Sequence, residues 1–221
     1  MGLKGSLRNV STGVPPIPDS EVYLHDDWGD NRLTDRENSG TTTHNGVEGV
    51  YRPEWTVDSD NGFNEPTVQN ESLEIVGNDG IYTDINLNLD ETITWEIDAG
   101  IFDDGSSGGD ATYIHLFAEQ TSEETDDRYH RSYVLEARGD GREESLFEID
   151  DSGNVDILIR DASANAERDY VITREPDGTW ELIVNGVSQG TNTDVSHTTP
   201  AVTGIIGSDG TDAEIYEYKV S

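Results

Sequence analysis

Two carboxylates on one expected strand are the first residues in this sequence that could do chemistry. Glu96 and Asp98 alternate with Trp95 and Ile97, so both carboxylates would leave the same face of the strand. A pair of carboxyl groups can hydrolyse a glycosidic bond, one as the acid and the other as the nucleophile or base. Side chains at i and i+2 lie about 7 Å apart along a strand, which is too far for a retaining pair and leaves no opposite side for an inverting water. Hydrolysis by this pair is therefore not expected.

A second chemical feature is the segment Thr112–Glu119, which carries apolar or aromatic side chains on both faces, as a central strand does. Its even-numbered apolar residues would point into the core, so three ring residues would project together from the open face. Rings stack on the apolar faces of sugars, and charged groups bind sugar hydroxyls, so we predict a carbohydrate-binding patch. The predicted patch is Tyr113, His115, Phe117, Glu96, Asp98, Glu136 and Arg138. The alternative is that an inserted segment or a neighbouring subunit covers this face.

Aspartates gather in two expected loops. Asp103, Asp104 and Asp110 could offer oxygen ligands to calcium. The second group consists of Asp150, Asp151 and Asp156. Adjacent aspartates arise by chance in so acidic a chain, so solvated loops are the favoured interpretation and calcium is the alternative. The sequence has no cysteine and no H-E-x-x-H or G-x-S-x-G pattern, so a zinc site or a serine hydrolase has no support and we expect no cofactor.

The element that organises the chain is a pair of hairpins. Apolar and polar residues alternate in Tyr170–Arg174 and in Thr179–Val184, which predicts strands with one buried face. Glu175-Pro176-Asp177-Gly178 predicts the turn between them, and Asn185-Gly186 is the strongest two-residue hairpin signal, leading into a third strand. The buried face of the middle strand would consist of Trp180, Leu182 and Val184.

The rest of the chain repeats this pattern of short strands between turns, with no helical period of useful length. The other expected strands are Val22–His25, Val47–Tyr51, Glu54–Val57, Ser72–Val76, Gly80–Ile85, Thr92–Asp98, Thr112–Glu119, Tyr133–Arg138, Glu144–Asp150, Val155–Asp161 and Ala213–Val220. Asn38–Asn45 is interpreted as a polar loop. This organisation predicts an all-β fold, an antiparallel β-sandwich or jelly roll.

The hairpin pattern T-R-x-x-D-G-T-W-x-L-x-V-N-G, from Thr173 to Gly186, resembles the late hairpin of concanavalin A-like lectin/glucanase domains, the laminin G and pentraxin-like jelly rolls. The closing segment Ala213–Val220 resembles their last strand, and the resemblance covers most of the chain from about Glu21 onward. It implies two stacked antiparallel sheets, a concave face that often binds glycans, and loops that often carry calcium. The motif indicates a fold and not an activity.

The same resemblance bears on catalysis. Glucanases of this superfamily carry E-x-D-x-E or E-x-D-x-x-E on a strand, and Glu96 and Asp98 match the first two carboxylates. Gly100 and Ile101 stand where the third carboxylate should be. Because a retaining mechanism needs both a nucleophile and an acid/base, the incomplete motif predicts that the chain is not an enzyme.

The charge of the 221-residue chain is strongly negative, because 47 Asp and Glu residues stand against 13 Lys and Arg residues, a net charge of -34. Aromatic residues within alternating strands argue against a disordered acidic chain. The carboxylates are spread evenly, which favours adaptation to molar salt over a calcium-loaded module. At that ionic strength the Debye length is about 3 Å, so self-repulsion is screened. We therefore expect an extreme halophile, or one of its viruses, as the source, and no nucleic-acid binding.

The two ends of the chain predict its organisation. Residues 1–20 contain Val14-Pro15-Pro16-Ile17-Pro18 and several glycines, which predicts an extended arm before a sandwich of residues 21–221. The arm is either a disordered tail or an attachment peptide that lies on a partner subunit. The N-terminus MGLKGSLRNV has no apolar segment, and no run of 18 apolar residues exists, so we expect neither a signal peptide nor a membrane span.

Together these features predict a non-enzymatic exterior structural or adhesion protein of a haloarchaeal virus, such as a turret, fibre or tail decoration. Its expected partners are other virion subunits, bound through the arm, further copies of itself, and a host-cell glycan. It would be assembled in a high-salt host cytoplasm and act on the virion exterior. The alternative is a glycoside hydrolase or polysaccharide lyase of a halophilic archaeon.

Overall fold

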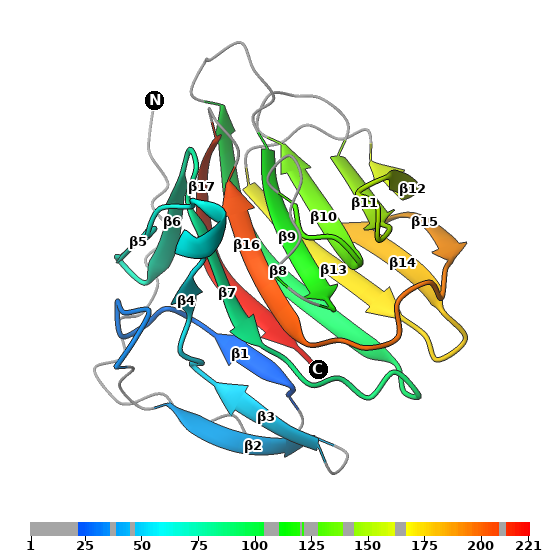
Figure 1. Ribbon diagram of the computed structural model, residues 1–221, viewed down its shortest axis with the longest axis horizontal. Coiled ribbons are helices and arrows are strands. Elements are labelled where there is room, and N and C mark those ends of the chain that lie inside the picture. Colours follow the sequence, from blue (N-terminus) through cyan, green and yellow to red (C-terminus); the bar gives the residue numbers. More distant parts are fainter. Residues whose placement is uncertain are drawn as a thin grey trace.

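The computed structural model describes residues 22–35, 39–44, 47–103, 111–119, 121, 128–138, 144–161, 167–207 and 211–221. These residues form two β-sheets that stack face to face (Figure 1). One short 3-10 turn, η1 (Ser59–Asn61), is the helical element of this part of the chain, which contains no helix able to cross a membrane. The predicted all-β sandwich is confirmed.

The larger sheet has ten strands. In spatial order its main path runs through β15 (Val187–Thr193), β14 (Thr179–Val184), β13 (Glu167–Arg174), β8 (Ile93–Asp103), β17 (Thr211–Val220), β1 (Leu24–Asp26), β3 (Val47–Tyr51) and β2 (Gly40–His44). β6 (Ser72–Val76) also pairs with β17, and β5 (Thr67–Gln69) pairs with β6. The hairpin strands of the sequence motif therefore lie at one edge of this sheet.

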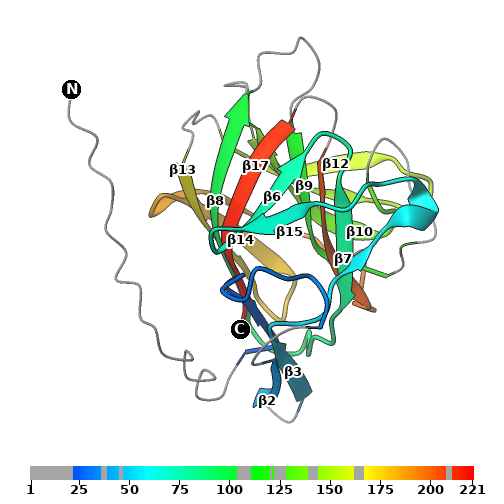
Figure 2. The same ribbon diagram turned by 90° about the vertical axis from the view of Figure 1, so that its left-hand side faces the viewer.

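The smaller sheet has seven strands and faces the viewer in Figure 1. Its order is β12 (Val155–Asp161), β11 (Glu144–Ile149), β10 (Ser132–Arg138), β9 (Ala111–Ala118), β16 (Val202–Gly207), β7 (Gly80–Asp84) and β4 (Thr56–Val57). Figure 2 shows the two layers from the side, with β8 and β17 in one layer and β7 and β10 in the other.

The core between the sheets is rich in aromatic rings. Trp95 and Trp180 stack with their ring centroids 5.7 Å apart, and Tyr133 of the smaller sheet lies 4.5 Å from Trp180. Phe117 completes the cluster, with its ring 5.1 Å from that of Tyr133. All four rings are fully buried. Since large aromatic side chains dominate core energetics, this cluster ties the two sheets together.

The hairpin motif folds as its residue pattern predicts. Burial alternates along β14, with Trp180, Leu182 and Val184 on the core side. Asn185 and Gly186 have φ values of 50° and 76°, which are the two positive angles that a type I′ hairpin turn needs. The residues of the hairpin themselves therefore determine the structure at this edge of the larger sheet.

Three strands differ from the sequence interpretation, and the first is β5, which lies in a segment where no strand was expected. Asn38–Asn45, interpreted as a polar loop, contains β2, which pairs antiparallel with β3. Val202–Gly207 was not expected to be a strand, yet β16 pairs with both β7 and β9 and is buried throughout. A Thr-rich edge and a segment buried on both faces both lack the period-2 alternation of a half-buried strand. The predicted arm, residues 1–20, lies outside the described residues.

Candidate functional site

A pocket of about 400 Å³ opens at one end of the sandwich. Four segments build it: the residue after β9, the residue before β10, the end of β11 with its following turn, and the connection from β15 to β16. Its lining residues are Glu119, Arg131, Glu148, Asp150, Asp151, Ser196 and His197. Binding residues are commonly carried where connections leave a rigid scaffold, so this pocket is the candidate site.

Glu148 and His197 form a buried pair in the pocket wall. Nε2 of His197 lies 2.7 Å from Oε1 of Glu148 and 2.9 Å from the carbonyl oxygen of Ile149. Because both partners are acceptors, this ring nitrogen carries the hydrogen. The two side chains are only 7% and 9% exposed, and burial raises the pKa of Glu148 although His197 opposes that shift. A buried carboxyl with a raised pKa beside a pocket is a common mark of a functional site.

Arg131 reaches the pocket from an unusual backbone position. Its φ of 51° lies in the left-handed region, which residues with a side chain seldom adopt. The backbone is held there because the N–H of Glu119 donates to the Arg131 carbonyl at 3.0 Å and the N–H of Arg131 donates to the Asp150 carbonyl at 3.4 Å. The guanidinium Nη1 is 3.9 Å from Oε2 of Glu119 and the side chain remains 40% exposed, so it can also contact a ligand. Such conformations concentrate at binding sites.

Asp150 shapes the turn that presents Asp151. Oδ1 of Asp150 accepts hydrogen bonds from the backbone N–H groups of Ser152 at 2.8 Å and Asn154 at 2.9 Å. Oδ2 accepts another from Nδ2 of Asn154 at 2.8 Å, and the bonds from Asn154 and Ser152 lower the pKa of Asp150. The carboxylate of Asp150 is thus committed to the turn, whereas Asp151 is exposed at the rim.

The chemistry of this pocket suits a ligand rich in hydroxyl groups. All seven lining residues are polar, and four carry carboxyl groups that accept hydrogen bonds. Arg131 and Ser196 supply donors. Within the described residues no three His, Asp or Glu side chains are grouped so that they could hold a metal ion. Of the predicted calcium ligands, Asp103 ends β8, while Asp104 and Asp110 lie outside the described residues, so calcium remains a prediction for that loop.

The three ring residues predicted to share the open face of β9 do not do so. The register of β9 shifts against both β10 and β16 between His115 and Phe117. This β-bulge adds one residue to β9 and returns Phe117 to the inner face, where its ring packs against Tyr133 and Trp180. The prediction of an exposed Phe117 is wrong because strict alternation cannot anticipate a bulge.

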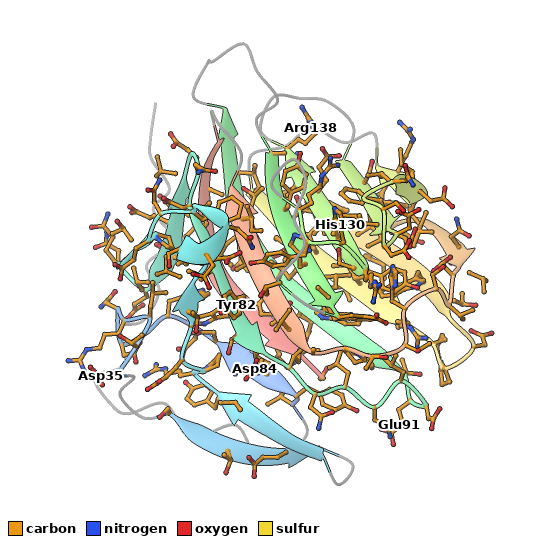
Figure 3. All side chains as sticks on the ribbon, viewed as in Figure 1. Asp35, Tyr82, Asp84, Glu91, His130 and Arg138 are labelled. Atoms are coloured by element: carbon orange, nitrogen blue, oxygen red, sulfur yellow. The ribbon has the colours of Figure 1, made fainter. Side chains whose placement is uncertain are left out.

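Tyr113 and His115 stay on the outer face but are covered. The ring of Tyr129, from the β9–β10 connection, lies 4.5 Å from that of His115, and the guanidinium of Arg128 lies 5.4 Å from the ring of Tyr113. Figure 3 labels the adjacent His130 in front of these strands. Tyr113 is 9% exposed and His115 fully buried. Arg128 and Tyr129 of the β9–β10 connection therefore cover this face, in agreement with the alternative that a segment of the chain would cover it.

The polar members of the predicted patch are divided between the two sheets. Glu136 lies opposite Tyr113 on β10 and pairs with Arg138 at 2.9 Å, and Arg138 is labelled in Figure 3. Glu96 and Asp98 belong to β8 in the larger sheet, where Glu96 pairs with Lys219. The expectation of one continuous patch is wrong, because stacked sheets lie about 10 Å apart and separate the two groups.

Sequence reasoning singled out Asp150 and Asp151 but missed the other five residues of the pocket: Glu119, Arg131, Glu148, Ser196 and His197. Leu146 and Glu148 share one face of β11, so a core position for Leu146 also places a carboxylate inward. This alternation can point to Glu148 only when it is known which face of β11 packs against the core. His197 lies in a connection without a motif, so no pattern in the sequence marked it.

No protein-family model matches the chain, and no curated protein sequence matches it significantly. Solved structures do resemble it. The metal-free form of the Emp46p carbohydrate recognition domain gives a TM-score of 0.55 at 13% identity, over 75% of this chain and 87% of that one. The legume lectin-like domain from Entamoeba histolytica gives 0.53 at 14% identity, over 76% and 89%. A botulinum neurotoxin type C structure gives 0.54 at 8% identity, over 80% and 45%.

At these identities the similarity concerns the fold, which is a concanavalin A-like sandwich of the legume-lectin kind. Emp46p has also been crystallised in a potassium-bound form, whose TM-score here is 0.52.

Proposed function

We propose that this chain is a non-enzymatic glycan-binding protein and that the pocket beside Glu148 and His197 holds the sugar. The main support is a pocket that is lined by seven polar residues and lies where loops leave one end of a lectin-like sandwich. The neighbouring folds add support, since Emp46p is a carbohydrate recognition domain and cell entry of the type C neurotoxin depends on interaction with two ganglioside molecules. Function in such folds lies in the site and not in the sandwich.

This proposal moves the glycan away from the rings of β9. His115 and Phe117 are fully buried and Tyr113 lies under Arg128, so those rings offer no free stacking surface. The pocket suits a sugar better than the β9 rings do, because its carboxylate oxygens and its half-exposed guanidinium can form hydrogen bonds with adjacent sugar hydroxyls.

We further propose the setting in which the protein works: the exterior of a haloarchaeal virus, where it attaches the particle to a host-cell glycan. The net charge of -34 and the even spread of carboxylates support a molar-salt environment. Residues 1–20 would bind neighbouring virion subunits, and several copies of the chain would assemble together. Several weak sugar contacts on one particle then add up to firm attachment.

Glycan binding is tested with immobilised neutral oligosaccharides in molar KCl, using wild type, Glu148→Gln, Asp151→Asn and the control Glu181→Gln. Glu181 lies on β14 in the larger sheet, where Ser188 donates to it, and it does not line the pocket. Each pocket substitution should weaken binding about tenfold, the loss expected for one hydrogen bond to a charged group. The control should bind like wild type. Equal binding by all four proteins would place the sugar elsewhere.

A glycoside hydrolase or polysaccharide lyase is the competing function. The observation in its favour is Glu148, a pocket carboxyl whose pKa burial raises, as a general acid requires. The same oligosaccharides are therefore assayed for chain cleavage. We expect no release of new reducing or unsaturated ends. Cleavage by wild type that disappears in Glu148→Gln would replace the binding function with catalysis.

A further inference from the structure

The connection of residues 194–201 supplies two of the pocket residues, Ser196 and His197, yet it has no regular structure. It crosses from β15 in the larger sheet to β16 in the smaller sheet. Its backbone is held at Asp194, whose N–H donates to the Gly178 carbonyl at 2.9 Å. Because it has no ladder of backbone hydrogen bonds, the residues beyond Asp194 depend on side chains for their shape. The question is therefore which side chain fixes this wall of the pocket.

Tyr133 on β10 makes the contacts that such a role requires. Its ring is fully buried in the aromatic core, 4.5 Å from Trp180, so the position of its hydroxyl is set by packing. That hydroxyl donates to Oδ1 of Asp194 at 2.5 Å. It also accepts the backbone N–H of His197 at 3.3 Å. One buried hydroxyl thus contacts the wall at two points.

Asp194 connects Tyr133 to the rest of the wall through further hydrogen bonds. Its carboxylate accepts the backbone N–H of Ser196 at 2.9 Å and the Ser196 hydroxyl at 3.1 Å, while its carbonyl accepts Nε1 of Trp180 at 3.3 Å. Burial opposes ionisation, but the hydrogen bonds from Tyr133 and Ser196 outweigh it and lower the pKa of Asp194. The wall is therefore bonded to β10 of the smaller sheet and to β14 of the larger sheet at once.

We propose that Tyr133 is the positioning residue of the glycan pocket, which it serves by fixing the wall that carries Ser196 and His197. It does not line the pocket itself. Because the ring of His197 reaches Glu148 from this wall, a shift of the backbone at Asp194 also moves the buried pair. The inference rests on the proposed function for its effect on glycans, but the mechanical role of Tyr133 is independent of any ligand.

The mechanical role is tested by amide hydrogen exchange of Tyr133→Phe in molar KCl, without ligand. The ring and the core packing remain, and only the hydroxyl is lost. The matched control is Tyr129→Phe, which removes another buried hydroxyl, the one that donates to Asp58 at 2.7 Å on the outer face. We expect the amides of Ser196 and His197 to exchange about tenfold faster in Tyr133→Phe, as one lost charged hydrogen bond implies, and to be unchanged in Tyr129→Phe.

A double variant sharpens this test. Asp194→Asn alone should loosen the same two amides, and the double variant should show less than the sum of the two single effects, because both substitutions break the Tyr133–Asp194 contact. Wild-type exchange rates at Ser196 and His197 in Tyr133→Phe would overturn the proposal. So would strictly additive effects of the two substitutions.

The link to function is measured with mannotriose and galactotriose as the neutral probes. For whichever probe wild type binds, Tyr133→Phe should raise the dissociation rate about tenfold and leave the association rate nearly unchanged, because most affinity changes at an existing site lie in dissociation. Tyr129→Phe should bind like wild type. If both variants lost affinity equally, the cause would be a general loosening of the fold, and the positioning role of Tyr133 would be overturned. If wild type binds neither probe, the proposed glycan function fails for neutral sugars, while the exchange data still decide the role of Tyr133.

Discussion

Gly178, in the turn between β13 and β14, contacts the segment that forms the pocket wall. Its φ is 83°, and its carbonyl accepts the N–H of Asp194 at 2.9 Å. A Cβ at this position would meet the side chain of Val195 and would lie 2.7 Å from the carbonyl oxygen of Asp194. The turn glycine therefore does more than reverse the chain, because it lets the wall approach the hairpin.

We expect Gly178→Ala to destabilise the protein by about 2–4 kcal/mol, which combines a left-handed alanine with a steric clash. The control is Gly186→Ala, where φ is 76° but no atom of the part of the chain that the structure describes lies within 4 Å of the added carbon. That variant should lose only about 1–2 kcal/mol. Thermal unfolding in molar KCl compares the two. Equal losses would contradict the close approach of Val195 and Asp194.

His115 should make stability depend on pH. Complete burial, with a smaller contribution from Arg128, lowers its pKa from 6.5 to about 3, and neither ring nitrogen has a hydrogen-bond partner among the described residues. Between these two values the unfolded chain binds a proton that the folded chain does not. The contribution of His115 to the free energy of unfolding is therefore complete above pH 6.5. It is lost as the pH falls toward 3, by roughly 1.4 kcal/mol for each pH unit.

His115→Leu removes this titrating group while keeping an apolar side chain of similar size. We expect its unfolding free energy to fall less steeply than that of wild type between pH 6.5 and about 4. Carboxylates titrate in both proteins, so the difference between the two pH profiles isolates His115. Parallel profiles would show that His115 binds its proton equally well in the folded and unfolded states, which would contradict the lowered pKa.

At the scale of elements, the bulge in β9 decides which side chains reach the core. It turns Phe117 inward, onto Tyr133 and Trp180. Phe117→Ala should therefore cost about 3–5 kcal/mol of stability, the usual loss for a buried phenylalanine. Val187→Ala, at a side chain that is 62% exposed, is the control and should cost less than about 0.5 kcal/mol. A stable Phe117→Ala variant that has lost glycan binding would instead support the open-face prediction.

The second prediction at this scale concerns residues 1–20, which the sequence predicts to be an extended arm. Residues 1–20 contain three prolines and no run of alternating apolar residues, so they should contribute little to the sandwich core. Deleting them should leave the melting temperature within about 2 °C of the full chain. If the proposed virion function holds, the deletion should also abolish incorporation into the virion or oligomer. Melting curves and gradient sedimentation measure the two effects. Normal incorporation of the shortened chain would refute attachment through the arm.

At the scale of the whole molecule, charge should decide the conditions under which the fold exists. A net charge of -34 repels itself strongly in dilute buffer, and molar salt reduces the Debye length to about 3 Å. We expect the sandwich to unfold or expand below roughly 0.5 M KCl, where the Debye length exceeds about 4 Å. Circular dichroism during a KCl titration records the transition. A β spectrum that is unchanged at about 50 mM salt would rule out the requirement for salt.

Local sequence was sufficient for the features that neighbouring residues encode. The alternation in Thr179–Val184 gave the correct buried face of β14, and Asn185-Gly186 adopts the positive φ values of its predicted turn. Side-chain alternation and turn geometry depend on a few adjacent residues, so they can be recognised before any tertiary contact exists. The same patterns, taken together, were enough for the all-β sandwich.

Tertiary structure alone decided the bulge of β9, the strand β16 and the pocket. The extra residue in β9 is visible only against the registers of β10 and β16. The pocket joins Glu119, Glu148 and His197, which lie on segments far apart in the chain and share no motif. Their meeting depends on how the two sheets stack and on how the β15–β16 connection is bonded between them. Such long-range packing is a property of the whole folded chain, so no short window of sequence contains it.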